Sequence, residues 1–372
     1  MGEIGAVHFS GLRRAADVHA GRHALIAMSL AWLPLALFAL MQGSAIGPPA
    51  QQPFALDFAA HVRFLLAVPL LILAGPVVDQ RLSPVVADLR ATLVEVPARP
   101  RFDAMLAGLV RLRDRFLPDL ILLAAAWGDS ILIGIRRPTG WQLGPNGAFS
   151  PAGLWFMFVS QPIFEYLFFR WLWRIVIWTV FLVRFARLPL TLIASHPDRA
   201  GGLAVLGEAQ PIFAVVALPL SMIGATNFAR QIAYGGAKLA EFQRPLVLFV
   251  VVVFALVLGP LLAFAPKLIA LKRRGLLEFG GFAHEYTRRF EDKWLGAKTD
   301  EDPLGTQDLQ ALADLGNSFR VVREMSIVPV EARAALTLLV AAVAPMIVPV
   351  AVQISVPEVV RRLVAAFLGH GG

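Results

Sequence analysis

Four ionisable side chains lie inside apolar stretches of this 372-residue sequence: Asp129, Glu165, Arg170 and Arg174. Charges are costly within a membrane-spanning helix, so an ionisable residue there is by default a hypothesis for a functional site. Arg170 and Arg174 are four residues apart, so they share one face of a helix. Two arginines on one face favour an anion as the permeating ion. We therefore take these four residues as candidate permeation residues.

Glu165 precedes Arg170 by five residues in the same apolar stretch. At 3.6 residues per turn this is a rotation of about 500°, which places the two side chains about 140° apart around the helix. The carboxylate of Glu165 therefore needs a partner other than Arg170.

The stretch that contains three of these residues, 154–188, is too long for one perpendicular crossing, and two registers compete. In the first, the helix enters near Ala152 and the arginines reach the interface, with Trp171 and Trp173 at headgroup level. In the second, the span covers 163–183, and Arg170 and Arg174 must face a bundle interior or a watery cavity. The alternation of Trp and Arg in 169–174 favours the first register.

The composition is that of a membrane protein. Hydrophobic residues make up 57% of the chain and charged residues 16%, against about 45–50% and about 25% in soluble domains. The absence of cysteine excludes disulfides and cysteine chemistry. The net charge of +8 is explained by basic residues that hold loops on the cytoplasmic side and contact anionic lipid, so we expect no nucleic-acid partner.

Seven apolar runs predict an all-α, polytopic helical membrane protein with about seven transmembrane helices and a helical cytoplasmic part. The predicted spans are 24–41, 62–78, 120–135, the 154–188 stretch, 211–228, 245–265 and 334–353. Residues 1–265 are expected to form a transmembrane bundle of six spans, with an amphipathic cytoplasmic segment at 79–117. Residues 266–333 form the main cytoplasmic helical region, and 334–372 contain the last span and a tail.

The distribution of basic residues sets the expected orientation. Of the 34 lysines and arginines, 24 fall in segments predicted to be cytoplasmic and 7 in segments predicted to lie outside. This bias places the N-terminus in the cytoplasm. Seven spans then place the C-terminus outside, unless the tail or the long fourth stretch adds a partial crossing.

Aromatic residues recur at steps of three and four in the cytoplasmic region, which predicts a stripe on one helix face. The stripe consists of Phe279, Phe282, Tyr286, Phe290 and Trp294. We expect it to serve core or subunit packing, or to bind a cytosolic partner protein. A second helix is predicted to begin near Thr306 as N-cap. This face, together with the small residues Ala124 and Gly128 in the third span, makes a homo-oligomer reasonable.

No motif indicates an enzyme. The sequence has no Walker A motif, HExxH, GxSxG or dinucleotide fingerprint. The seven histidines are scattered, and we expect neither a metal site nor a cofactor.

Three motifs in the second half of the chain carry a resemblance: FRWLWR at 169–174, HPDRAGGL at 196–203 and DPLGTQDLQALADLGNSFRVVREM at 302–325. Together they resemble a family of uncharacterised multi-pass bacterial inner-membrane proteins. The resemblance implies a bacterial source and a location in the inner membrane. It transfers no activity and no functional residues.

Two functions follow as hypotheses. The buried charges and the proline-interrupted spans favour a channel or transporter for a small ion. The alternative is a non-transporting scaffold or signalling protein that acts through the helices of 266–333.

Overall fold

The computed structural model describes residues 4–48, 51–136, 138, 140–296 and 306–353. The structure is 83% helical. Within the described residues, extended backbone pairs only in two isolated bridges, Val94 with Leu190 and Leu143 with Phe149. The predicted all-α fold class is therefore confirmed.

Among the described residues, seven helices are long and apolar enough to cross a membrane. They cover His19–Met41, Phe58–Leu93, Phe116–Arg136, Pro151–Phe185, Ala204–Gly235, Leu239–Val257 and Ala332–Gln353. The chain is an integral, multi-pass membrane protein. Lipid contact along these spans follows from their apolar outer surfaces.

The α-helices have the following bounds: α1 Ile4–Met41, α2 Phe58–His61, α3 Val68–Asp88, α4 Arg99–Arg113, α5 Phe116–Arg136, α6 Pro151–Trp155, α7 Gln161–Phe185, α8 Ala204–Ala209, α9 Ala214–Gly235, α10 Gln243–Val257, α11 Ala265–Trp294, α12 Gln307–Glu324, α13 Ala332–Val343 and α14 Ile347–Gln353. Three π-helical segments interrupt the second and fourth spans: Val62–Ala67, Leu89–Leu93 and Phe156–Ser160.

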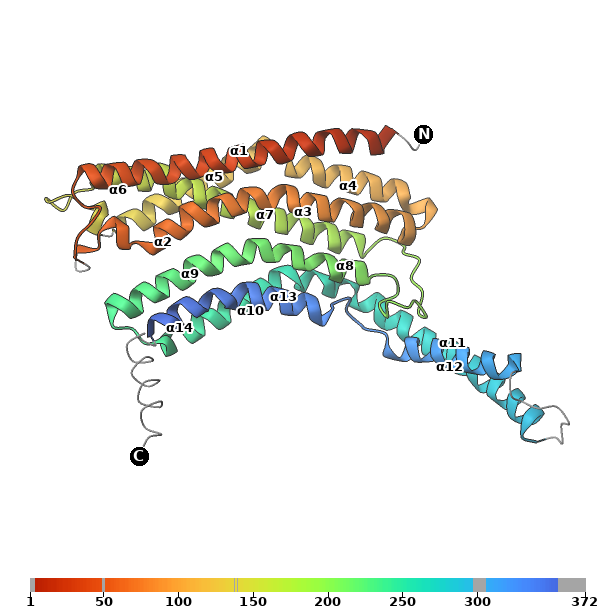
Figure 1. Cartoon of the computed structure of the whole chain (residues 1–372). Helices are drawn as coiled ribbons and strands as arrows, with labels where there is room; N and C mark the ends of the chain where they lie inside the picture. Colours follow the sequence, from red (N-terminus) through yellow and green to blue (C-terminus); the bar gives the residue numbers. More distant parts are fainter. Residues whose placement is uncertain (1–3, 49–50, 137, 139, 297–305, 354–372) are drawn as a thin grey trace, which may run out of the picture.

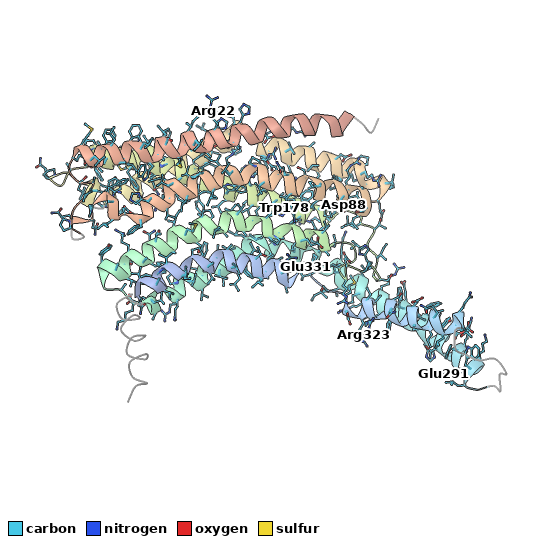
Figure 2. The ribbon with its side chains drawn as sticks, in the orientation of Figure 1. Arg22, Asp88, Trp178, Glu291, Arg323 and Glu331 are labelled. Carbon is cyan, nitrogen blue, oxygen red and sulfur yellow. The ribbon has the colours of Figure 1, made fainter. Side chains whose placement is uncertain are left out.

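The spans lie side by side in a bundle, from one end of which α11 and α12 project as a hairpin (Figure 1). We call this the hairpin end; α1 begins there and α4 lies there. At the opposite end, the far end, α1, α9 and α14 come to a close. Exposed charges such as Glu291 and Arg323 cover the projecting hairpin (Figure 2).

The core runs along α1, α3 and α7. α1 packs on α3, α7 packs on α3, α4 and α5, and α9 joins α3 to α13 and α14. Each contact buries one apolar stripe of a helix and leaves the opposite stripe facing outward, as expected for a bundle in lipid. The buried polar residues lie on the inner stripes.

The amphipathic helix predicted within 79–117 is α4, and it packs on a partner helix. The ring of Phe102 lies 6.1 Å from that of Phe181 and 5.9 Å from that of Phe185 in α7. The sequence left open whether this helix lies on the membrane surface or on another helix. The segment is also shorter than predicted, because α3 continues to Asp88 and α5 begins at Phe116.

The aromatic stripe of α11 packs in part against α12. The hydroxyl of Tyr286 donates to the backbone carbonyl oxygen of Asp308 at 3.2 Å, and Nε1 of Trp294 donates to the side-chain Oδ2 of Asp308 at 3.3 Å. Thr306 caps α12 as predicted, by accepting the amide of Leu309. Phe279 and Phe290 are half-buried, whereas Phe282 is 62% exposed. The stripe therefore leaves the ring of Phe282 mostly exposed among the residues that the structure describes.

The HPDRAGGL loop forms a compact turn before α8. Asp198 accepts the amides of Ala200, Gly202 and Ala204 at 2.9, 3.1 and 3.0 Å. Gly201 and Gly202 have φ of +68° and +96°, a region that favours glycine. Asp198 thus accepts the amide of Ala204, the first residue of α8. The tail predicted after the last span lies outside the described residues.

Candidate functional site

Three side chains form a hydrogen-bonded series between the second and fourth spans. Arg63 Nη1 donates to Gln161 Oε1 at 2.8 Å, and Gln161 Nε2 donates to Glu165 Oε1 at 2.6 Å. Glu165 is only 3% exposed. Within the described part of the chain, Glu165 Oε2 and Arg63 Nε are buried without a hydrogen-bond partner. A buried polar atom without a partner is costly, so the series is incomplete as it stands.

Local backbone geometry positions both ends of this series. Arg63 lies in the π-helical segment Val62–Ala67, and Gln161 directly follows the segment Phe156–Ser160. π-Helical turns inside α-helices occur frequently at functional sites. The guanidinium carbon of Arg63 lies 5.5 Å from the ring centre of Phe164, a cation–π contact that favours the charged side chain in an apolar setting.

The third span adds a second carboxyl group. Asp129 of α5 lies close enough to Glu165 to act on it electrostatically. Two adjacent contacts fix α5 against the fourth span: Ser130 Oγ donates to the Met157 carbonyl oxygen at 2.6 Å, and Trp127 Nε1 donates to that of Phe158 at 3.0 Å. The freed carbonyls of the π-helical segment thus accept side-chain donors from α5.

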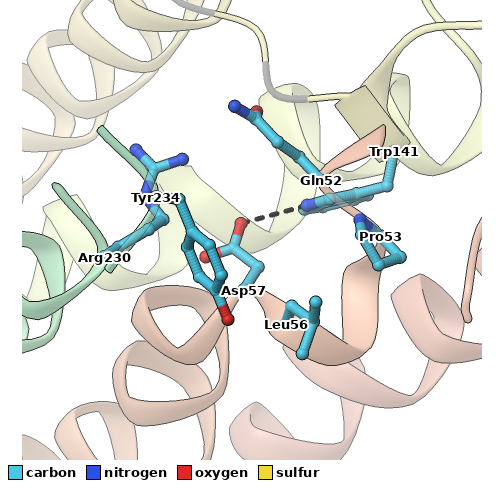
Figure 3. Close-up of a pocket in the computed structure, with 7 residues that line it drawn as sticks. All are labelled: Gln52, Pro53, Leu56, Asp57, Trp141, Arg230 and Tyr234. Carbon is cyan, nitrogen blue, oxygen red and sulfur yellow. Dashed lines mark hydrogen bonds between the residues drawn. The ribbon is translucent and has the colours of Figure 1, made fainter. Parts of the chain in front are cut away.

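A small pocket opens at the far end, beside Asp57 (Figure 3). Its volume is about 30 Å³, enough for about one water molecule. Trp141 Nε1 donates to Asp57 Oδ2 at 3.0 Å, while Arg230 and Tyr234 of α9 flank the carboxylate. Asp57 and Arg230 both act electrostatically on Arg63, so the pocket lies next to the buried series.

A second charged cluster lies toward the hairpin end. Arg170 pairs with Asp119, and Arg174 Nη2 donates to Asp79 at 2.6 Å. The cavity beside them, with a volume of about 170 Å³, is lined by Asp79, Arg113, Asp114, Arg170, Trp173 and Arg174. It is large enough for several water molecules.

The pairing of Arg170 favours the interfacial register of the fourth span. Its partner Asp119 belongs to the first turn of α5, a helix of 21 residues. Such a helix is about 31 Å long, just enough for a hydrocarbon core of about 30 Å. The first turn of α5 must therefore lie at the membrane boundary, and Arg170 lies with it. Glu165 lies about 7.5 Å deeper along α7.

The structure brings two of the four predicted residues together and separates the others. Asp129 lies near Glu165, while Arg170 and Arg174 belong to the hairpin-end cluster. Glu165 pairs with Gln161 and not with Arg170, as the rotation along the helix predicted. The sequence analysis missed Arg63, Gln161 and Asp57. An arginine within an apolar run was the available signal for Arg63.

Comparisons of the chain with protein-family models, with curated proteins and with solved structures give no match.

Proposed function

We propose that this protein is a channel or transporter for a small ion, and that the series Arg63–Gln161–Glu165 with Asp129 is its ion site. The observation that carries the proposal is a buried network of charged residues that joins three spans and contains two polar atoms without partners. Burying charged groups within the membrane costs free energy, and membrane proteins commonly retain them where ions bind or protons move.

The polar groups extend from within the membrane to its boundary at the hairpin end. Along α7 they run from Gln161 to Arg170, nine residues apart, or about 13 Å. The pocket of Asp57 continues the series at the far end, and the cavity of Arg113 and Asp79 continues it at the hairpin end. A path for an ion needs polar groups at both entrances and in the middle, and this arrangement supplies them.

The pair Arg170 and Arg174 does not support the anion that the sequence analysis favoured. Arg170 and Arg174 share a helix face, but each is paired with its own carboxylate, Asp119 and Asp79. The predicted preference for an anion relied on two uncompensated positive charges, and it loses that support. The buried site itself contains two carboxyl groups and one guanidinium.

Flux through reconstituted liposomes tests the proposal. The purified protein is expected to conduct one of the ions in a panel of small anions, alkali cations and protons. Arg63→Gln removes a charge-assisted hydrogen bond worth about 1.5–3 kcal/mol, so we expect the flux to fall about tenfold or more. Arg90→Gln, which removes an exposed partner of Asp103, is the matched control. Absence of flux for every ion would overturn the proposal.

The paired arginines are tested in the same assay. We expect Arg170→Ala/Arg174→Ala to change conductance or selectivity, because it removes both cations from the hairpin-end cavity. If the double variant lowers only the yield of protein, the arginines anchor the helix at the interface and do not line the path.

The resemblance to bacterial inner-membrane proteins supports a location in that membrane. The hairpin end is proposed to face the cytoplasm, because the basic α4 and the start of α11 lie there. α1 begins on the same side.

A scaffold or signalling role is the alternative, and the exposed Phe282 supports it. The hairpin of α11 and α12 projects from the bundle and leaves this ring and Leu277 uncovered. Such a surface is suited to a second copy of the chain or a cytosolic protein. Phe282→Ser should reduce oligomer size or pull-down of a partner without changing flux. Unchanged size and binding would remove this alternative.

A further inference from the structure

We infer that a second site, separate from the buried series of Arg63, binds a single-chain carboxylate amphiphile of the fatty-acid class. The site is a cavity of about 420 Å³ between α3, α4 and α7. This volume lies in the lower part of the range of about 300–1,000 Å³ that is typical of small-molecule sites. Binding at this site does not depend on the proposed ion flux.

The cavity has apolar walls and one charged end. Apolar side chains from all three helices line it, among them Leu106 of α4 and Phe181 of α7. Its charged lining residues are Asp79, Arg113 and Arg174, which also line the neighbouring 170 Å³ cavity and therefore lie together. Phe181 is seven residues beyond Arg174 on α7, or about 10 Å. A ligand with one charged end and one apolar body matches this arrangement.

The charged end favours an anion. Its lining contains two guanidinium groups and one carboxylate. In both ion pairs the cation is the more buried partner: the side chain of Arg174 is 21% exposed and that of Asp79 53%, while Arg113 is 40% and Asp114 53% exposed. Charges in contact with water are screened more strongly than buried ones, so the guanidinium groups dominate at the cavity. A ligand carboxylate accepts charge-assisted hydrogen bonds from such groups.

The indole of Trp178 is an independent indication of a ligand. Trp178 lines the cavity and is 9% exposed, and its Nε1 is buried without a hydrogen-bond partner among the described residues. An indole N–H only donates, and its burial without an acceptor costs free energy. Trp178 follows Arg174 by four residues, so the two side chains share a face of α7. The two oxygens of one carboxylate offer acceptors to both.

The direction of the cavity distinguishes a free fatty acid from a phospholipid of the bilayer. Arg170 lies at the membrane boundary, and Phe181 lies eleven residues further along α7, or about 16 Å. The headgroup layer adds only about 5–7 Å to the hydrocarbon on each side. The apolar end of the cavity therefore lies outside the bilayer on the hairpin side. A bilayer phospholipid keeps its chains in the hydrocarbon, whereas a free fatty-acid anion can place its chain in this cavity.

Equilibrium binding of radiolabelled laurate tests the site, with the full-length protein in phosphatidylcholine nanodiscs and empty nanodiscs as background. We expect saturable binding of laurate and none of dodecanol, which has the same chain without the charge. Arg174→Gln removes a charged donor and should weaken laurate binding about tenfold or more. Arg90→Gln, which removes the exposed partner of Asp103, is the matched control and should bind laurate as the wild type does.

Two further variants locate the ligand. Ser83 lines the cavity on α3, and its hydroxyl donates to the carbonyl oxygen of Asp79 in the same helix. Ser83→Phe should keep the fold and abolish saturable binding, because its ring occupies the cavity. Brominated laurate quenches nearby indoles, so it should saturably quench the tryptophan fluorescence of the wild type. Trp178→Phe should lose that saturable part.

Each contrary outcome removes a defined part of the inference. Saturable binding that survives Ser83→Phe in the folded protein would place the ligand elsewhere. Equal binding of laurate and dodecanol would overturn the carboxylate. Displacement of laurate when phosphatidylglycerol replaces part of the phosphatidylcholine would assign the cavity to a bilayer phospholipid. Absence of saturable laurate binding overturns the site whatever the ion flux, whereas laurate binding without any ion flux overturns only the transport proposal.

Discussion

The rings of Phe64 and Phe156 meet edge to face, with 6.0 Å between their centres. Each ring belongs to a π-helical segment, one in the second span and one in the fourth. The two irregular turns are thus packed against each other, next to Arg63 and Gln161. This contact fixes the distance between the two helices at the level where the guanidinium must reach the amide.

Phe64→Ala should therefore damage both stability and flux. Phe64 is fully buried, and loss of such a ring costs about 3–5 kcal/mol. Thermal unfolding in detergent should show this loss, and ion flux should fall because Arg63 loses its packing. Phe158→Ala is the matched control, since this ring of the same π-helical segment is largely exposed. A Phe64→Ala protein as stable as Phe158→Ala would contradict the packing argument.

Arg63→Met should destabilise the protein in a manner that depends on pH. The substitution leaves Gln161 Oε1 without its donor and the buried Glu165 carboxylate without the positive charge of Arg63, and a buried polar group without a partner costs about 1–3 kcal/mol. Protonation of Glu165 removes its charge, so the difference in melting temperature from wild type should narrow in acidic buffer. Arg63→Lys keeps the positive charge and should lower the melting temperature less than Arg63→Met does. A difference independent of pH would show that only packing was lost.

The positions of the spans could be predicted from the sequence, because the thickness of the bilayer sets the length of the apolar runs. The run predicted at 120–135 lies within α5, and that at 211–228 lies largely within α9. The end of a helix was harder to predict where the helix continues past its apolar residues. α3 extends to Asp88 in this way, ten residues past the end of the apolar run at 62–78.

The buried site could be predicted only in part. Glu165 and Asp129 could be recognised as candidate site residues, because each is a charged residue within an apolar run. Gln161 is neutral and gave none, although it connects the charges. Arg63 looked like the edge of a span, because the helix actually begins earlier, at Phe58. π-Helical turns have no sequence pattern of their own among those used here, so the alignment of Arg63 with Gln161 required the structure.

The ion pair of Arg170 and Asp119 should contribute little to stability. The side chains are 36% and 30% exposed, and pairs in contact with water are typically worth about 0–1 kcal/mol. A double-mutant cycle of Arg170→Ala and Asp119→Ala, followed by thermal unfolding, should give a coupling energy in that range. A coupling of several kcal/mol would mean that the pair is shielded from water and that the interfacial register is wrong.

The Asp198 loop should loosen in acid. Burial by itself raises the pKa of the Asp198 carboxyl, but the amides of Ala200, Ala204 and Gly202, with His196, outweigh it and hold the pKa below its ordinary value. The stabilisation is therefore complete above the unfolded-state pKa of about 3.9 and is lost as pH falls through the lower folded-state pKa.

Hydrogen exchange of the loop amides measures this effect. Exchange at Gly202 and Ala204 should accelerate at acidic pH beyond the intrinsic trend. Asp198→Ala removes the acceptor and should show fast exchange at every pH, with a loss of about 1–2 kcal/mol by analogy with helix caps. If the variant keeps the wild-type pH profile, Asp198 is not the group that titrates.

Gly207→Ala should weaken the joint between α8 and the segment that leads into α13. A β-carbon at this position would lie 2.3 Å from the carbonyl oxygen of Pro329, a distance that the backbone can accommodate only by moving. Overpacking of this kind costs about 1–3 kcal/mol, and the melting temperature should fall. Gly224→Ala in α9 is the matched control, because nothing lies within 4 Å of its β-carbon position. It should gain about 0.5–1 kcal/mol, since alanine restricts the unfolded chain and favours the helix. If both variants have the same stability, α8 is not held against Pro329 as the structure shows.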